Sequence, residues 1–224
     1  MELHADSLLP GWTRAHVAAH VGYNAWALAR LVGWARTDVE TPMYASGAER
    51  NHEITRGADL APNALRALGD ASSADLDEAW RDLPADAWAY PVRTMQGATV
   101  AVSQTVWMRT RELFLHTVDL AAGPTVQDIP AAVLQRLLGD ITNTWAARGD
   151  DVGLLLRDTD TGAVLGDTGH DDPHTVSGTL AALAGWASGR SSTGVRSNRA
   201  GLGAALVVNG ALRRRGDNGA AQPR

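Results

Sequence analysis

The feature that most limits the possible folds is a long apolar periodicity between residues 13 and 37. Apolar side chains recur there at spacings of three and four, the repeat of one face of an α-helix. They are Val17, Val21, Ala25, Leu28 and Val32. Pro10 and Gly11 favour a turn just before this segment, and Thr13 is a suitable capping residue. The pattern therefore predicts a helix from Thr13 to about Thr37.

Further helical segments follow this one and indicate a bundle. We expect helices over residues 48–57, 63–83 and 103–122, the second of them interrupted near Gly69. Residues 87–102 are typical of extended or irregular chain, because they contain Pro91, Gly97 and several β-branched side chains.

The pattern changes after residue 123, where Pro124 and Pro130 mark a linker. A short helix over 131–148 leads to two apolar runs, 153–157 and 163–166, which a turn at 159–162 joins as a hairpin. Residues 174–190 predict a strand and then a helix that Gly189 ends. We therefore expect an α+β chain with a helical bundle over 1–123, a small α+β domain over 124–212 and a disordered basic tail over 213–224.

Composition excludes several classes of function. The chain of 224 residues has a net charge of −5, which gives no reason to expect a nucleic-acid partner. It shows neither a signal peptide nor an apolar run long enough to span a membrane, so we expect a cytoplasmic protein with no membrane partner. It contains no Cys and no Lys, which excludes a protein thiol nucleophile and a lysine Schiff base. Any sulfur chemistry must therefore use a thiol from outside.

Glu112 and His116 lie four residues apart in the otherwise apolar stretch RTRELFLHTVDL. This spacing places both side chains on one side of a helix, although a surface ion pair has the same spacing. The first helix carries a second such pair, His16 and His20. Facing helices of a bundle that bear imidazole and carboxylate groups commonly build a metal site. Two His and one carboxylate suit zinc with an open fourth position, and non-haem iron can use the same set.

Four segments in order resemble the mycothiol-dependent maleylpyruvate isomerases, which belong to the wider DinB-like metalloenzyme superfamily. The segments are GWTRAHVAAHVGYNA, TPMYASGAERNHEI, WMRTRELFLHTVDL and WASGRSSTGV. The resemblance implies a DinB-like bundle in which His20, Glu112 and His116 bind zinc. It gives no ligand role to His16, which fits a helix start or a second layer around the ligands. It also implies that Arg50 and Arg190 are active-site arginines.

The resemblance further implies the reaction, a cis to trans isomerisation of maleylpyruvate to fumarylpyruvate in gentisate and related aromatic degradation. Mycothiol would be the thiol cosubstrate, and zinc would favour its thiolate form. Arg50 and Arg190 are suited to bind the substrate carboxylates. Because Arg190 would come from the second domain, we expect an active site between the domains.

The sequence departs from the family in two places. Family members have a further amphipathic helix ahead of the SLLPGW turn, whereas here Met1 stands six residues before Ser7. A bundle without that helix would expose the apolar faces of its neighbours, so we expect instability or association through that face. Residues 199–224 also do not match the end of the family.

Two other functions share most of these features. A mycothiol S-transferase would use the same zinc ligands, and only the two arginines favour a dicarboxylate substrate instead. A non-catalytic metal-binding module would close the site with a fourth ligand, for which His16 is the candidate. His170 and His174 in the stretch GDTGHDDPH could also suggest a metal loop, but its Gly, Asp and Pro content favours an exposed loop.

Overall fold

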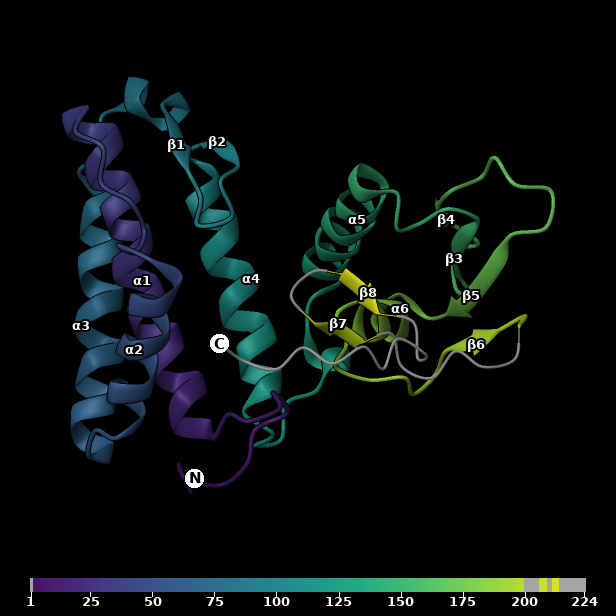
Figure 1. Ribbon diagram of the computed structural model, residues 1–224, viewed down its shortest axis with the longest axis horizontal. Coiled ribbons are helices and arrows are strands. Elements are labelled where there is room, and N and C mark those ends of the chain that lie inside the picture. The colour runs from purple at the N-terminus through teal and green to yellow at the C-terminus, as the bar shows by residue number, and fades with distance from the viewer. Residues whose placement is uncertain (1, 200–205, 209–210, 214–224) are drawn as a thin grey trace. The chain divides into compact units, whose positions relative to one another are not determined.

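The computed structural model describes residues 2–199, 206–208 and 211–213 of the chain (Figure 1). The chain divides into two compact units, Met1–Gly123 and Pro124–Arg224. The first is helical and the second mixes helices with a sheet, which confirms the predicted α+β class. Within the described residues, no helix combines the length and the apolar character that crossing a membrane requires.

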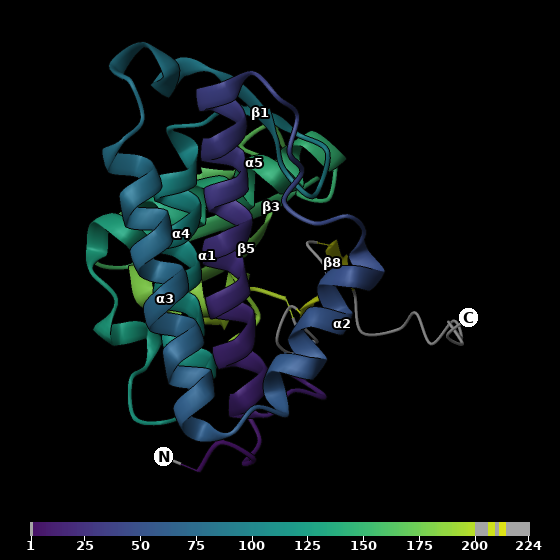
Figure 2. The same cartoon turned by 90° about the vertical axis from the view of Figure 1, so that its left-hand side faces the viewer.

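The first unit is organised around its longest helix, α1. This helix contacts α2, α3 and α4, and Figure 2 shows it between α2 and α3 with α4 behind. The elements are α1 (Arg14–Thr37), α2 (Gly47–Ala58), α3 (Pro62–Arg81), the 3-10 helix η1 (Ala85–Ala89), strands β1 (Pro91–Arg93) and β2 (Thr99–Ala101), and α4 (Gln104–Asp119). The two strands form an antiparallel hairpin. Ahead of α1, residues 2–13 form turns and one bridge between Asp6 and Thr13.

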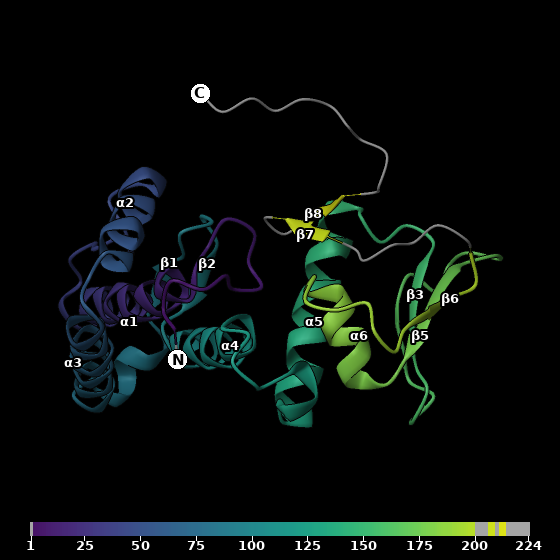
Figure 3. The same cartoon turned by 90° about the horizontal axis from the view of Figure 1, so that it is seen from below.

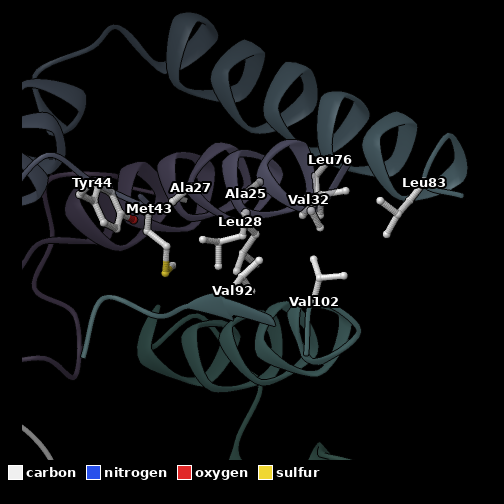
Figure 4. Close-up of a cluster of buried hydrophobic side chains, with 12 residues drawn as sticks. Ala25, Ala27, Leu28, Val32, Met43, Tyr44, Leu76, Leu83, Val92 and Val102 are labelled. Carbon is white, nitrogen blue, oxygen red and sulfur yellow. The ribbon is translucent and has the colours of Figure 1, made fainter. Parts of the chain in front are cut away.

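The central position of α1 follows from its small and aliphatic side chains. Alanines let neighbouring helices approach closely, while Leu28, Leu31 and Val32 are 0 to 1% exposed and fill the core. Figure 4 shows this cluster, in which Leu76 of α3 and Val92 of β1 also pack. The helix begins after Thr13, as predicted, and ends at Asp38, whose φ of 59° is left-handed.

The remaining helices of this unit mostly match their predicted ranges. Ser46 caps α2, since its hydroxyl accepts a hydrogen bond from the backbone N–H of Glu49 at 3.0 Å. The predicted interruption near Gly69 is wrong, because α3 is continuous from Pro62 to Arg81. Gly lowers helix stability by only about 1 kcal/mol, and packing of α3 against α1 outweighs that effect.

The second unit packs two helices on a small sheet. The strand order is β4-β3-β5-β6, with β3 and β5 parallel and the other neighbours antiparallel. The β3–β4 pairing confirms the predicted hairpin. The elements are the 3-10 helix η2 (Val126–Asp128), α5 (Ala131–Arg148), β3 (Leu154–Asp158), β4 (Val164–Gly166), β5 (His174–Gly178), α6 (Leu180–Ala187) and β6 (Arg196–Ser197).

Figure 3 shows α5 and α6 beside the sheet. The core of this unit consists of side chains from these two helices and from β3 and β5. Trp145 of α5 and Trp186 of α6 meet edge to face, with ring centroids 6.1 Å apart. Leu156 of β3 and Val176 of β5 pack against them. A further antiparallel pair consists of β7 (Leu206–Val208) and β8 (Ala211–Arg213). Residues 214–224 of the predicted basic tail lie outside the described residues.

Candidate metal centre

Three side chains predicted as metal ligands converge between α1 and α4. Nε2 of His20 lies 3.0 Å from Oε2 of Glu112, and Nε2 of His116 lies 3.1 Å from the same oxygen. The three ligand atoms are all within 4.8 Å of one another. The i, i+4 spacing brings Glu112 and His116 together on α4, and the contact between α1 and α4 adds His20.

The three ligand side chains are largely buried, with exposures between 6 and 17%, and each affects the pKa of the others. Burial lowers the pKa of His20 below its ordinary value, despite the hydrogen bond to Glu112. Burial by itself would raise the pKa of Glu112, but hydrogen bonds from His116 and His20 outweigh it and hold that pKa well below its usual range. Burial also opposes the charge on His116, yet its hydrogen bonds to Asp119 and Glu112 raise the pKa of this imidazole. Glu112 is therefore an ionised acceptor shared by two imidazoles.

Asp119 completes the centre, although it was not predicted as a site residue. This carboxylate is fully buried, and its Oδ2 accepts a hydrogen bond from Nδ1 of His116 at 2.8 Å. Its presence leaves Nε2 of His116 directed at Glu112. A carboxylate that holds the far nitrogen of an imidazole is the usual support of a metal-binding His. The signal was present in the sequence, since Asp119 follows His116 by three residues and so shares its side of the helix.

The residues present fit a metal ion. Both imidazoles direct Nε2 to one point, the carboxylate oxygen at that point is ionised, and the far nitrogen of His116 is held by a second carboxylate. Two neutral imidazoles and one carboxylate are a ligand set of zinc, and iron(II) also accepts it.

His16 lies one turn before His20 but takes no part in this cluster. Its Nδ1 lies 2.8 Å from Oγ1 of Thr13 and accepts the backbone N–H of Thr13 at 3.3 Å. This ring therefore caps the start of α1, which agrees with the helix-start interpretation. Among the described residues, the group of potential metal ligands here consists of His20, Glu112 and His116 alone. The closed four-ligand alternative thus lacks its proposed fourth ligand.

Arg50 lies beside the centre, where α2 approaches α1. Its Nη2 is 3.3 Å from Nδ1 of His20, and because a guanidinium only donates, His20 accepts through Nδ1. The proton of a neutral His20 ring is then on Nε2, facing Glu112. An imidazole that binds a metal through Nε2 carries its proton on Nδ1 instead and cannot accept from Arg50. Metal binding through Nε2 of His20 would therefore exclude this hydrogen bond.

The other candidate residues lie in the second unit. Arg190 follows α6, and its Nη1 donates to the carbonyl oxygen of Ser188 at 2.7 Å. His170 pairs with Asp167 at 2.8 Å, while Nε2 of His174 lies 2.8 Å from the Ser197 hydroxyl. Within the part of the chain that the structure describes, these histidines belong to no group of three potential metal ligands.

Comparison with known proteins gives matches along nearly the whole chain. Residues 1–121 match the model of the mycothiol maleylpyruvate isomerase N-terminal domain, and residues 128–216 match that of the corresponding C-terminal domain. A crystal structure of the mycothiol-dependent maleylpyruvate isomerase is 47% identical, with a TM-score of 0.85, over 88% of this chain and 82% of that chain. A histidine-to-alanine mutant of the mycothiol-dependent maleylpyruvate isomerase matches with the same identity and coverage and a TM-score of 0.84. No curated protein matches the chain.

Proposed function

The chain belongs to the mycothiol maleylpyruvate isomerase family, and from this premise we propose that it converts maleylpyruvate to fumarylpyruvate with mycothiol and zinc. The observation that carries the proposal is the convergence of His20, Glu112 and His116 beside Arg50 in a chain without cysteine. The ligand set supports zinc, and the absence of a protein thiol requires a thiol cosubstrate. The reaction would serve the degradation of gentisate and related aromatic compounds.

The chemistry requires a temporary loss of the double bond. The cis alkene of maleylpyruvate cannot rotate, but a thiolate that adds to the conjugated carbon leaves a single bond and places negative charge on the keto oxygen. Rotation and elimination of the same thiolate then give the trans isomer, so the thiol is regenerated. Zinc held by His20, Glu112 and His116 would lower the pKa of the thiol and so supply the thiolate near neutral pH.

The residues of the chain have separate tasks in this proposal. Asp119 fixes the ring of His116 through Nδ1, so that Nε2 stays directed at the ligand point. Arg50, released from Nδ1 of His20, would bind a substrate carboxylate and stabilise the charge that develops on the keto oxygen. We propose Arg190 as a second carboxylate-binding group. The low exposure of the ligand side chains, between 6 and 17%, strengthens each of these electrostatic interactions.

The test is an isomerase assay that follows both reactants. Purified protein loaded with zinc is mixed with maleylpyruvate and a catalytic amount of mycothiol, and the formation of fumarylpyruvate and the free thiol concentration are measured together. We expect many turnovers per thiol with no net loss of thiol. Turnover of one equivalent with consumption of the thiol would instead identify a mycothiol S-transferase of the same scaffold. If no thiol-dependent reaction occurs, the protein is neither the isomerase nor the S-transferase.

A further inference from the structure

Tyr44 is a buried side chain whose hydroxyl has no hydrogen-bond partner. It lies in the segment between α1 and α2, two residues before the cap Ser46, and is 9% exposed. Figure 4 shows it at one end of the buried cluster, next to Met43. Among the described residues, Oη of Tyr44 and Oε2 of Glu53 are the buried side-chain polar atoms without a partner. Buried tyrosine hydroxyls normally find one, so this atom requires an explanation.

The position of Tyr44 connects it to the metal centre through Arg50. The guanidinium carbon of Arg50 lies 6.0 Å from the centre of the Tyr44 ring, and Nη2 of Arg50 lies 3.3 Å from His20. Burial is the main influence on the pKa of Tyr44, and the charges of Arg50, Glu112, Glu53 and Arg30 contribute to it. The ring that bears the unpartnered hydroxyl therefore lies beside the arginine that contacts His20.

The hydroxyl can act only as a donor or a neutral acceptor under ordinary conditions. Burial raises the pKa of Tyr44 to about 12, so the group keeps its proton at neutral pH. A buried donor without a partner destabilises the folded protein, because it has lost its hydrogen bond to water and gained none. An unpartnered donor on a ring beside Arg50 has an explanation if its acceptor arrives with the ligand.

We propose that Tyr44 donates a hydrogen bond to the substrate, at a carboxylate or keto oxygen that Arg50 also binds. The inference rests on the proposed function. If His20 held a metal through Nε2, its Nδ1 would carry the proton and could not accept from Arg50, so the guanidinium would be available to anionic oxygens. Arg50 then brings such an oxygen to the side of Tyr44, where the protonated hydroxyl supplies a second donor. Tyr44 is thus a further catalytic residue of the isomerisation.

The test is the Tyr44→Phe variant, which removes the hydroxyl and keeps the ring. We expect kcat/KM for maleylpyruvate at saturating mycothiol to fall about 10-fold to 100-fold, with an unchanged zinc content. We expect the Tm to stay the same or to rise, because the variant deletes an unpartnered donor. Tyr90→Phe is the matched control, since the hydroxyl of Tyr90 donates to Asp38 at the far end of α1. It should retain full activity and have a lower Tm.

Two results would overturn this role of Tyr44. The first is a Tyr44→Phe enzyme that is as active as the wild type. The second is a Tm of Tyr44→Phe that falls as far as the Tm of Tyr90→Phe, which would show that the Tyr44 hydroxyl has a structural partner. If the wild-type protein catalyses no isomerisation, the proposed function fails instead. Binding of maleate to the zinc-loaded protein then tests Tyr44 directly: about tenfold weaker binding by the variant supports the donor, and equal binding excludes it.

Discussion

Replacing Asp119 by Asn should weaken metal binding without unfolding the helical unit. In the wild-type chain, Nδ1 of His116 lies 2.8 Å from Oδ2 of Asp119. The substitution keeps the size of the side chain and an acceptor oxygen for Nδ1, but removes the negative charge. A hydrogen bond to a charged group contributes about 1.5–3 kcal/mol and one between neutral groups about 0.5–1.5 kcal/mol. The difference of about 1–1.5 kcal/mol corresponds to a roughly tenfold higher Kd for zinc.

The assay is a zinc titration in competition with a chelator of known affinity, at fixed pH and salt. Asp77→Asn is the matched control, because Asp77 is an exposed carboxylate on α3 that pairs with Arg81 at 2.6 Å. The control should bind zinc as the wild type does. An Asp119→Asn protein with wild-type zinc affinity would refute the supporting role of this carboxylate. So would a loss of zinc that is matched by a loss of helical structure.

Three further predictions follow from the same geometry. Without metal, hydrogen bonds to Asp119 and Glu112 raise the pKa of His116 above 6.5, so protons should compete with zinc below that raised pKa. The Kd for zinc should then rise about tenfold per pH unit, with an onset at lower pH in Asp119→Asn; a flat profile between pH 5 and 8 would contradict this. Gly57→Ala should lower the free energy of unfolding, measured in urea, by about 1–3 kcal/mol. The new Cβ would lie only 2.7 Å from Cβ of Ala19. Gly33→Ala is the control, because the space at its Cβ is open and the protein should not be destabilised. Arg50→Gln should raise KM for maleylpyruvate at least tenfold and leave zinc content unchanged, and an unaltered KM would exclude Arg50 from substrate binding.

The sequence predicted those parts of the fold that depend on local spacing. The helical repeat of α1, the capping position of Thr13 and the hairpin of β3 and β4 were each correct within a few residues. The parallel pairing of β3 with β5 was not predicted. These strands are separated in the chain by β4 and a loop, so their pairing leaves no local sequence pattern. The interruption expected at Gly69 was wrong, since tertiary packing along α3 overrides the propensity of a single glycine.

The residues of the candidate site differ in how far the sequence alone predicts them. The i, i+4 spacing alone places Glu112 and His116 together. Spacing could not choose between His16 and His20, because that choice depends on how α1 is rotated against α4, and it was the family resemblance that selected His20. No spacing or pattern in the sequence distinguishes Arg50, since it lies on a polar helix with exposed neighbours. Tyr44 gives none either, because the absence of a partner for its hydroxyl is visible only in three dimensions.

Metal content, measured by mass spectrometry on the purified chain and on a His20→Ala variant, is the decisive test of the metal centre. We expect about one zinc per wild-type chain and almost none in the variant, with both proteins equally helical. Equal metal content in the two proteins, or a folded wild-type chain that binds no zinc when it is supplied, would contradict a metal centre at His20, Glu112 and His116.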